Sequence, residues 1–482
     1  MSLLGIGKLL TDRTALTPDR IAIEFGDRSI TYRELAAAAA DRAAEFAAAG
    51  CEPGDRVAAL SRNCPEQIEV FFGCALSGLI MVPLNWRLTA AELDYQIANA
   101  DPKILLIEPG LGHLVADRKT VDITRTPAAH VPVSPARPFG GGDPLLLLYT
   151  SGTSGKPKGA VLSHANCFWT NLSLDRTAEL TGDDVVLQVL PQCHVGGWNV
   201  QPLLAWWKGA TVVLEQSFDT ARVLSLIENR RVTTMMGVPT TYLMLSQHPG
   251  FADADLSSLR QVIVGGAPMP LPLIQTWTAR GVTILQGYGL TEAAPNVLCV
   301  PAEYAHAKAG SAGRPYMYVD VSLRPETGEL LVRGPNVFRG YWRDPAATAR
   351  ALPDGWLATG DVAVRDQDGF YWIRGRLSDM YISGGENVYP AEVEQVLAGH
   401  PAIAEAAVIG VPDQRWGETG MAFVVLRDGC AANPDALTAY CRERLARFKV
   451  PAHLRFPAEL PKLTSGKVDK VTLRKVAARS AP

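Results

Sequence analysis

One stretch organises this sequence: Tyr149-Thr150-Ser151-Gly152-Thr153-Ser154-Gly155-Lys156-Pro157-Lys158-Gly159. Residues 145–148 before it are four consecutive leucines and predict a buried strand. Glycine lets backbone N–H groups approach an oxyanion closely, hydroxyl groups add donors, and lysine adds positive charge. This composition favours a phosphate-binding loop, although its spacing differs from the GxxxxGK[ST] pattern of a Walker A loop. A surface loop made of turn-forming residues is the alternative.

The composition sets the class of protein. With 482 residues the chain is longer than one ordinary domain, so we expect a large body and at least one further unit. Hydrophobic residues make up 47% and charged residues 20%, as in an ordinary soluble globular protein. The net charge of -3 gives no reason to invoke nucleic acid or an anionic membrane. The eight cysteines form no CxxC pair, which favours a reduced, cytoplasmic setting.

Neither a membrane span nor a protein-built metal cage is expected. The longest uncharged apolar stretch, residues 71–84, is shorter than a bilayer-spanning helix. The N-terminus lacks the basic and apolar segments of a signal peptide. The eight histidines show no HxH or HExxH spacing. The remaining question is which soluble fold the chain adopts.

Strand and helix signals alternate along the first three hundred residues. Residues 21–30 predict a hairpin that turns at Gly26-Asp27, and Thr31 with Glu34 predicts a capping box at the start of a helix that ends near Ala49. A strand, a helix and a strand follow at residues 56–60, 65–76 and 80–83. Residues 125–144 favour a flexible surface connection because they are rich in Pro, Gly and Ala. Further strands are expected at residues 185–190, 210–214, 233–236, 261–264 and 283–285.

The pattern of predicted secondary structure changes in the last third of the chain. From about residue 317, short strands separated by Gly and Asp turns indicate a small β-rich subdomain. Gly375-Arg376-Leu377-Ser378-Asp379 is typical of a joint between domains. The predicted fold class is mixed α/β: a large N-terminal domain of helix-covered sheets with the β-rich subdomain, residues 1–377, and a small mobile α+β domain, residues 378–482.

Several short motifs occur in order along the chain. They are residues 147–159, Pro191-Gln192-Cys193-His194, Gln286-Gly287-Tyr288-Gly289-Leu290-Thr291-Glu292, Thr359-Gly360-Asp361, Gly375-Arg376, Gly384-Gly385-Glu386-Asn387 and Ser465-Gly466-Lys467. This set resembles the adenylate-forming superfamily of acyl-CoA synthetases, luciferases and peptide-synthetase adenylation domains, from about residue 10 to 475. The resemblance implies a two-step reaction. A carboxylate attacks the α-phosphate of ATP, releasing pyrophosphate, and a thiol then takes the acyl group from the adenylate, releasing AMP.

The resemblance also implies where ATP and Mg²⁺ bind. Thr150, Ser151, Gly152, Thr153 and Lys158 would hold the β- and γ-phosphates, Thr291 the α-phosphate, and Glu292 the Mg²⁺ ion. The nucleoside would be bound by Tyr288 stacked on adenine, by Gly266 and Ala267 on its other side, by Gln286, Gly287 and Gly289, and by Asp361 and Arg376 at the ribose. Taken alone, Thr291-Glu292 is an ordinary helix start and Gly360-Asp361 an ordinary turn, so these assignments rest on the motifs.

Further residues are assigned to catalysis and to coenzyme A. Lys467 matches the mobile catalytic lysine, whose ammonium would bridge the attacking carboxylate and the α-phosphate. His194 resembles the gate between the acid pocket and the thiol tunnel, with a buried structural histidine as the alternative. Gly384 and Gly385 would line the pantetheine tunnel, and Trp416 would pack against the adenine of CoA. Ser378 would be the hinge residue, where Asp or Lys is usual. Ala452 stands where a basic residue often contacts CoA, and Arg447, Lys449 and Arg87 could compensate for it.

The acid and the acceptor stay open at this point. The segment after His194 lacks the aspartate that pairs with an α-ammonium group, and this chain has Gln286-Gly287 where malonate activators carry an arginine before the Tyr-Gly motif, so a neutral pocket is expected. Glycines leave room for it, and Trp198 and Met236 would form apolar walls. The motifs resemble bacterial feruloyl-CoA synthetases and fatty-acyl-CoA ligases, which implies a hydroxycinnamate such as ferulate or a medium-chain fatty acid. CoA is the expected acceptor; a carrier-protein phosphopantetheine and a non-catalytic nucleotide-binding module are the alternatives.

Overall fold

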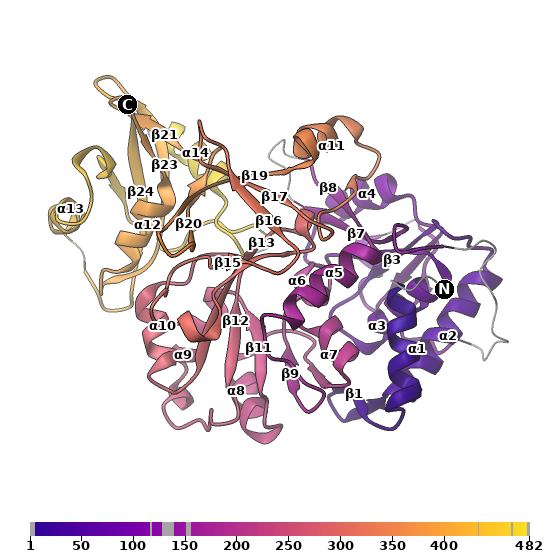
Figure 1. Cartoon of the computed structure of the whole chain (residues 1–482). Coiled ribbons are helices and arrows are strands. Elements are labelled where there is room, and N and C mark those ends of the chain that lie inside the picture. The colour runs from indigo at the N-terminus through magenta and orange to yellow at the C-terminus, as the bar shows by residue number, and fades with distance from the viewer. Residues whose placement is uncertain are drawn as a thin grey trace. The chain divides into compact units, whose positions relative to one another are not determined.

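The computed structural model describes residues 5–115, 118–127, 139–150, 156–431, 433–463 and 466–479 (Figure 1). The chain divides into two compact units. The first comprises Met1–Met269, Leu273–Val321 and Leu331–Ala358, and the second comprises Pro270–Pro272, Ser322–Leu330 and Thr359–Pro482. The predicted boundary at Ser378 between a large and a mobile domain stays a prediction.

A nine-stranded sheet forms one half of the first unit. In spatial order its strands are β15 (Arg314–Pro315), β14 (Asn296–Cys299), β13 (Thr283–Gly289), β12 (Gln261–Val264), β11 (Thr234–Gly237), β9 (Val185–Gln188), β10 (Thr211–Leu214), β1 (Ile21–Phe25) and β2 (Arg28–Thr31). Strands β13 to β1 pair in parallel, whereas β14, β15 and β2 are antiparallel edge strands. Parallel strands bring their carboxyl ends to one edge of the sheet, where ligands bind in open α/β folds.

A seven-stranded sheet carries the glycine-rich stretch. Its strands, in spatial order, are β18 (Gly340–Tyr341), β8 (Lys158–Ser163), β7 (Pro144–Thr150), β4 (Ile80–Leu84), β3 (Arg56–Leu60), β5 (Ile104–Ile107) and β6 (Val121–Asp122). Strand β7 pairs in parallel with β4 and antiparallel with β8, so the chain reverses direction at the predicted phosphate loop. The four leucines of β7 are buried, as expected.

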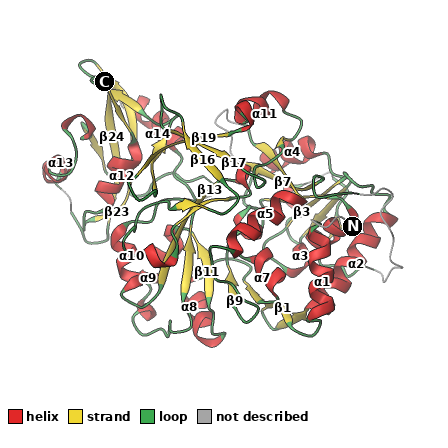
Figure 2. Ribbon diagram, viewed as in Figure 1, coloured by secondary structure: helices red, strands yellow, loops and turns green. Residues whose placement is uncertain are grey.

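Helices accompany both sheets of the first unit (Figure 2). They are α1 (Ile6–Leu16), α2 (Tyr32–Ala48), α3 (Pro65–Ser77), α4 (Ala90–Ala100), α5 (His164–Asp175), α6 (Gly196–Asn199), α7 (Pro202–Lys208), α8 (Thr220–Asn229), α9 (Pro239–Gln247), α10 (Leu271–Thr278) and α11 (Pro345–Ala351). Short 3₁₀ helices are η1 (Gly112–Leu114), η2 (Pro249–Phe251), η3 (Thr291–Ala293), η4 (Ala302–Tyr304) and η5 (Pro353–Gly355).

Local sequence signals account for the ends of several helices. The predicted capping box at the start of α2 is confirmed: the Thr31 side chain accepts a hydrogen bond from Glu34 N, and the Glu34 carboxylate accepts one from Thr31 N. The same reciprocal pair begins α4 at Thr89 and α5 at Ser163. Each box satisfies two backbone N–H groups that a helix start would otherwise leave unbonded.

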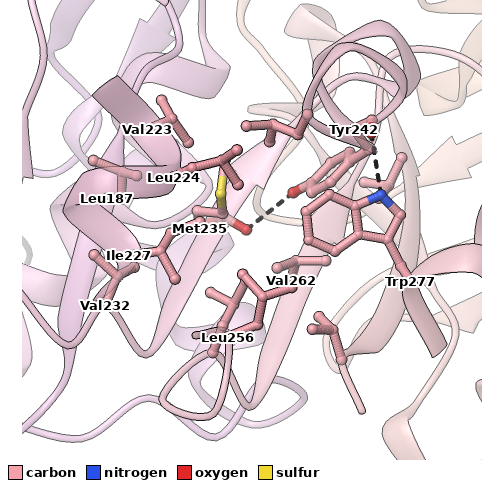
Figure 3. Packing of buried hydrophobic residues seen from close by; sticks show 14 of the residues in the cluster. Leu187, Val223, Leu224, Ile227, Val232, Met235, Tyr242, Leu256, Val262 and Trp277 are labelled. Atoms are coloured by element: carbon pink, nitrogen blue, oxygen red, sulfur yellow. Dashed lines mark hydrogen bonds between the residues drawn. The ribbon is translucent and has the colours of Figure 1, made fainter. Parts of the chain in front are cut away.

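The core under β11 and β12 combines apolar packing with two internal hydrogen bonds (Figure 3). The hydroxyl of Tyr242 donates to the carbonyl oxygen of Ile263 at 3.0 Å and also lies 3.3 Å from that of Met235, and Trp277 Nε1 donates to the carbonyl oxygen of Tyr242 at 3.1 Å. Branched residues of α8, among them Val223 and Ile227, fill the space beside them. The polar atoms of these two side chains are thereby paired inside the core.

The β-rich segment forms a four-stranded sheet, as predicted: β16 (Asp320–Leu323), β17 (Glu329–Arg333), β19 (Leu357–Arg365) and β20 (Tyr371–Arg376). A five-stranded sheet follows in the second unit, with β22 (Glu386–Val388), β21 (Tyr381–Ser383), β24 (Gly417–Leu426) and β23 (Ile403–Asp413) in that order and β25 (His453–Arg455) on β24. Its helices are α12 (Pro390–Ala398), α13 (Pro434–Arg442), η6 (Arg447–Lys449) and α14 (Lys470–Arg479).

The predicted mixed α/β class is confirmed, and so are the hairpin at residues 21–30 and the expected strands up to β13. Of the connection predicted at residues 125–144, residues 128–138 lie outside the described part of the chain. In that part, no helix has the length and apolar content needed to cross a membrane.

Candidate functional site

The hairpin of β7 and β8 positions the predicted phosphate loop. Thr150 and Lys158 are directly paired across the two strands, so the loop leaves and re-enters the sheet at these residues. The Thr150 hydroxyl lies 3.4 Å from the carbonyl oxygen of Lys158. Ser151, Gly152 and Thr153, which were assigned to the phosphates, lie outside the described residues.

The carboxylate of Glu292 lies beside this hairpin. Glu292 is in η3, and its backbone oxygen accepts a hydrogen bond from Phe338 N at 2.8 Å. Its Oε1 atom lies 3.5 Å from the hydroxyl of Thr150 and accepts a hydrogen bond from the hydroxyl of Tyr341 at 2.9 Å. The structure therefore brings together two residues predicted for the phosphates and the metal ion, although 142 positions separate them in the chain.

The donor set fits a Mg²⁺ ion that arrives with ATP. Among the described residues, no group of three or more His, Cys, Asp or Glu side chains is arranged to hold a metal ion. Mg²⁺ keeps several water ligands and is commonly bound through one or two carboxylates together with the phosphates of a substrate. One carboxylate, Glu292, next to the loop that is predicted to hold the phosphates satisfies this requirement. When bound, the ion would neutralise charge on the polyphosphate.

The predicted adenine segment lies at the carboxyl ends of β12 and β13. Gln286 pairs with Val264 of β12, whereas Gly287 and Tyr288 pair with β14 on the other side. Gly289 is required by packing, because a Cβ atom there would lie 1.6 Å from the carbonyl oxygen of Pro295. Gly266, with φ of 80°, follows the end of β12, and Ala267 comes next. Thr291 and Glu292 come directly after β13, which places the phosphate residues next to the adenine segment.

Small residues surround Met236 at the same sheet edge. A Cβ atom on Gly265 would lie 3.0 Å from Met236 Cε, and one on Gly196 would lie 4.0 Å from it. The end of the Met236 side chain therefore lies between these two glycines. The expectation that Trp198 forms a wall of the acid pocket is wrong: its side chain is completely buried, stacked on Phe71 at 4.6 Å between ring centroids.

His194 lies in the segment that leads into α6, where it is half-buried. Its backbone N donates to Pro191 O and its carbonyl oxygen accepts from Gly197 N, which forms a tight turn. Burial raises the pKa of the neighbouring Cys193 thiol to about 12, so this cysteine stays protonated and is a poor nucleophile at neutral pH.

The predicted ribose residues meet in the second unit. Asp361 and Arg376 are directly paired across β19 and β20, and Arg376 Nε lies 2.8 Å from Asp361 Oδ1. The Asp361 side chain is only 8% exposed, whereas that of Arg376 is 45% exposed. The turn before Asp361 is held by the buried carboxylate of Glu329, which accepts a hydrogen bond from Gly360 N at 3.0 Å.

Lys467 lies on an exposed loop just before α14. The loop is closed by a hydrogen bond from Leu463 N to Lys467 O at 2.7 Å and by a bridge between Lys462 and Val468. The exposed Ser378 precedes Asp379, whose carboxylate pairs with Arg474 of α14 at 2.9 Å. The predicted hinge segment and the helix after Lys467 are thus joined by an ion pair within the second unit.

Gly384 and Trp416 lie side by side. Gly384-Gly385 forms the turn between β21 and β22 with φ of 62° and 89°, and Gly384 N donates to Trp416 O at 2.8 Å. A Cβ atom on Gly384 would lie 2.9 Å from Trp416 Cε3. The Trp416 side chain is 45% exposed. Lys449, considered as a substitute for the basic contact missing at Ala452, pairs with Glu392 at 2.8 Å.

Tyr341 was not predicted from the sequence. It belongs to β18, which pairs with β8, and its ring lies 5.2 Å from Lys158 Nζ. The available signal was Gly340-Tyr341-Trp342, an aromatic pair after a glycine. Nothing in that signal indicates which carboxylate the phenol reaches. Two surface cavities of about 360 and 310 Å³ beside α4, lined in part by Lys103, His113 and Arg118, contain none of the predicted site residues.

The chain is similar to known proteins over nearly its whole length. The AMP-binding enzyme family matches residues 10–342, and the AMP-binding enzyme C-terminal domain matches residues 392–467. A feruloyl-CoA synthase of Amycolatopsis sp is 43% identical, over 98% of this chain and 99% of that protein. An indoleacetate–CoA ligase of Aromatoleum aromaticum is 39% identical, over 97% of each. The structure of the o-succinylbenzoate coenzyme A synthetase of Bacillus subtilis with ATP and magnesium ion is 33% identical, with a TM-score of 0.87 over 97% of this chain and 99% of that one.

These matches confirm the resemblance that the motifs indicated. They cover both units, and the relatives are acid–CoA ligases. The chain therefore belongs to the AMP-binding enzyme family, as an AMP-forming acid–CoA ligase that uses ATP, Mg²⁺ and coenzyme A.

Proposed function

We propose that this ligase activates an aromatic acid of the hydroxycinnamate type, such as ferulate, and transfers its acyl group to CoA. A medium-chain fatty acid is the second candidate, because both acids are elongated and carry no charge besides the reacting carboxylate. The feruloyl-CoA synthase and the indoleacetate–CoA ligase described above both carry the names of aromatic acids, which supports the first choice.

The observation that carries this proposal is the uncharged surrounding of Met236. Gly196 at the start of α6 and Gly265 after β12 lie next to the end of its side chain, and a flat ring needs the space that their missing side chains leave. Methionine suits an aromatic group because its polarizable sulfur packs favourably against rings. An anionic substrate tail would require a cationic partner there, and Gly287 supplies none.

In the first half-reaction, we assign the neutralisation of phosphate charge to Thr150, Lys158 and Thr291 together with Ser151, Gly152 and Thr153. Glu292 would hold Mg²⁺. Tyr288, with Gly266, Ala267, Gln286, Gly287 and Gly289, would bind adenine, while Asp361 and Arg376 would bind the ribose. Lys467 would stabilise the charge that moves from the attacking carboxylate to the α-phosphate. In this proposal these residues act electrostatically, because no protein group forms a covalent bond with the substrate.

In the second half-reaction, the thiol of CoA attacks the carbonyl carbon of the adenylate and AMP leaves. We assign the path of the pantetheine arm to Gly384 and Gly385, the stacking surface for the CoA adenine to Trp416, and the gate to His194. Rotation about a hinge at Ser378 would separate the two half-reactions. The exposure of the Trp416 ring supports free CoA as the acceptor, since an aromatic face in solvent can stack on a nucleotide base.

A screen of carboxylic acids for pyrophosphate release tests the substrate. Ferulate, coumarate, indoleacetate, octanoate, malonate and phenylalanine would be compared at equal concentration, with kcat/KM as the measure. We expect the hydroxycinnamates to exceed malonate and phenylalanine by at least about 100-fold, since an unpaired buried charge costs several kcal/mol. A preference for malonate or for an amino acid would contradict the neutral pocket.

A glycine substitution tests the pocket directly. In Gly265→Ala the new methyl group would meet Met236 Cε at 3.0 Å and reduce the space between the strand ends. We expect KM for ferulate to rise about 10-fold, whereas a short acid such as propionate loses little. Gly112→Ala is the matched control, because a Cβ atom there meets nothing within 4 Å. Equal loss for long and short acids would place the acid elsewhere.

A second assay identifies the acceptor. Acyl transfer would be measured with free CoA and with a phosphopantetheinylated carrier protein, starting in both cases from the acyl-adenylate. We expect turnover with CoA. Turnover with the carrier protein alone would contradict this part of the proposal and would leave the acid specificity unaffected.

A further inference from the structure

We propose that Tyr341 is a positioning residue for ATP binding, which orients the carboxylate of Glu292 through its hydroxyl group and holds Lys158 through its ring. This inference rests on the proposed roles of Glu292 and Lys158. Tyr341 lies outside the predicted motifs. In this proposal its side chain positions both the Glu292 carboxylate, which would bind Mg²⁺, and the Lys158 ammonium, which would bind the polyphosphate.

The contacts of Glu292 favour one of its two oxygens. In the described part of the chain, both side-chain hydrogen bonds to this carboxylate reach Oε1: from Tyr341 at 2.9 Å and from Thr150 at 3.5 Å. The 2.9 Å distance is within the normal range for an O–H donor, whereas 3.5 Å is longer than that range and marks a weak contact. Tyr341 therefore fixes the rotation of the carboxylate, with Oε1 bonded to the phenol and Oε2 available as a metal ligand.

The face of the same ring contacts Lys158. Its ammonium nitrogen lies 5.2 Å from the centroid of the Tyr341 ring, a distance at which the negative face of an aromatic ring attracts a cation. The phenol thus keeps a positive and a negative group close to each other at the base of the β7–β8 hairpin. Without the ring, the long lysine side chain would lose this orientation and would have to be ordered when the polyphosphate binds.

The backbone that carries this ring is held from several directions. Tyr341 pairs with Ala160 of β8, and its backbone N donates to the hydroxyl of Thr348 at 2.9 Å. The next residue, Trp342, donates its backbone N to Gly159 O at 2.7 Å and its Nε1 to Asn99 O at 3.2 Å. Strand β18 is therefore tied to β8 and to the end of α4. A side chain that is anchored in this way can set the positions of more flexible neighbours.

The experiment separates the hydroxyl from the ring with two variants. Tyr341→Phe removes only the hydroxyl, and Tyr341→Leu removes the ring as well. Equilibrium binding of α,β-methylene-ATP would be titrated with Mg²⁺, and binding of metal-free pyrophosphate would be measured separately. We expect Tyr341→Phe to raise the half-saturating Mg²⁺ concentration about 10-fold, since a hydrogen bond to a charged group is lost, and to leave pyrophosphate affinity within about 2-fold. Tyr341→Leu should also weaken pyrophosphate binding about 3-fold.

Tyr32→Phe is the matched control. It removes a buried phenol hydroxyl that donates to Ala210 O at 2.7 Å, so it reports a general loss of stability without changing the Mg²⁺ requirement. Circular dichroism would show that each variant is folded. If Tyr341→Phe and Tyr341→Leu have the Mg²⁺ requirement of the native protein, the inference is overturned. If the native protein binds the nucleotide analogue with no dependence on Mg²⁺, the proposed role of Glu292 fails instead.

Discussion

Arg376 Nε lies 2.8 Å from Asp361 Oδ1 across the directly paired strands β19 and β20. The carboxylate is largely buried and the guanidinium is half-exposed, so the arginine offsets part of the cost of burying the acid. The pair also fixes the direction of the Asp361 side chain on β19. Two hydroxyl groups of a ribose require an acceptor that is held in this way.

We expect Asp361→Asn to raise KM for ATP about 10-fold with a smaller change in kcat, because the amide keeps the shape and accepts hydrogen bonds less strongly. Initial rates of pyrophosphate release over a range of ATP concentrations measure this effect. Asp320→Asn removes the carboxylate of a surface pair, Arg333–Asp320 at 3.0 Å, and should leave KM unchanged. An unchanged KM in Asp361→Asn would exclude the ribose contact.

Lys467→Ala should reduce adenylate formation by at least about 100-fold, because one preorganised charge is lost at the reacting phosphate. Acyl transfer from supplied acyl-AMP to CoA should stay within about 3-fold of the native rate. The two half-reactions would be assayed separately. Lys462→Ala is the control, since Lys462 lies on the same loop but pairs with Glu405. Equal loss of both half-reactions would refute the assigned role.

Lys158→Ala should slow adenylation about 10-fold or more and leave thioester formation from acyl-AMP largely intact. The physical reason is that pyrophosphate, which this lysine is proposed to hold, is present only in the first step. Stopped-flow measurement of each half-reaction distinguishes the steps. A defect confined to thioester formation would mean that the β7–β8 hairpin serves the second step.

Gly384→Ala should impair the CoA step selectively. The new Cβ atom would meet Trp416 Cε3 at 2.9 Å, and the backbone φ of 62° is unfavourable for alanine. We expect KM for CoA to rise about 5-fold while adenylate formation stays unchanged, because displacement of the indole disturbs a stacking surface worth about 1 kcal/mol. Gly429→Ala, with a φ of 73° and open space around its Cβ position, controls for backbone strain alone.

His164, which is not a predicted site residue, should contribute to the pH dependence of the free energy of unfolding. Its Nδ1 accepts a hydrogen bond from Ile6 N at 3.2 Å, and burial lowers the pKa of the imidazole to about 4. The unfolded chain binds this proton near pH 6.5, so the folded state loses stability as pH falls from about 6.5 towards 4. We expect this histidine to contribute a loss of about 2 kcal/mol between pH 7 and pH 5.

Denaturant unfolding of the native protein and of His164→Asn at both pH values measures this contribution. Asparagine can still accept the hydrogen bond from Ile6 N, but it does not titrate. The variant should therefore lose less stability on acidification. The same pH dependence in both proteins would show that His164 is solvated or already protonated in the folded state.

Many local features were predictable because neighbouring residues determine them. The leucines of β7 required burial, Gly26-Asp27 permitted the turn of the β1–β2 hairpin, and Thr31 with Glu34 capped α2. The motifs identified the family and named the residues that carry charge. The phosphate-binding roles of Ser151 and Thr153 remain predictions, because these residues lie outside the described part of the chain.

Other features needed the folded chain. The sequence predicted that Trp198 lines the acid pocket, but its side chain packs against Phe71 and is completely buried. No sequence motif indicated a role for Tyr341, whose hydroxyl reaches a carboxylate 49 positions away. A hydrogen-bonding pattern within a helix or a turn depends on the next few residues, whereas such a contact depends on which strands pair and in which register.

The sequence alone determined the elements, the family and the set of charged and small residues available for chemistry, because periodicity and turn chemistry act over short distances along the chain. The tertiary structure decided which of them meet: the pairing of β18 with β8 brings Tyr341 to Glu292 and Lys158, and the pairing of β19 with β20 brings Arg376 to Asp361. These contacts follow from strand register, which many distant residues set together.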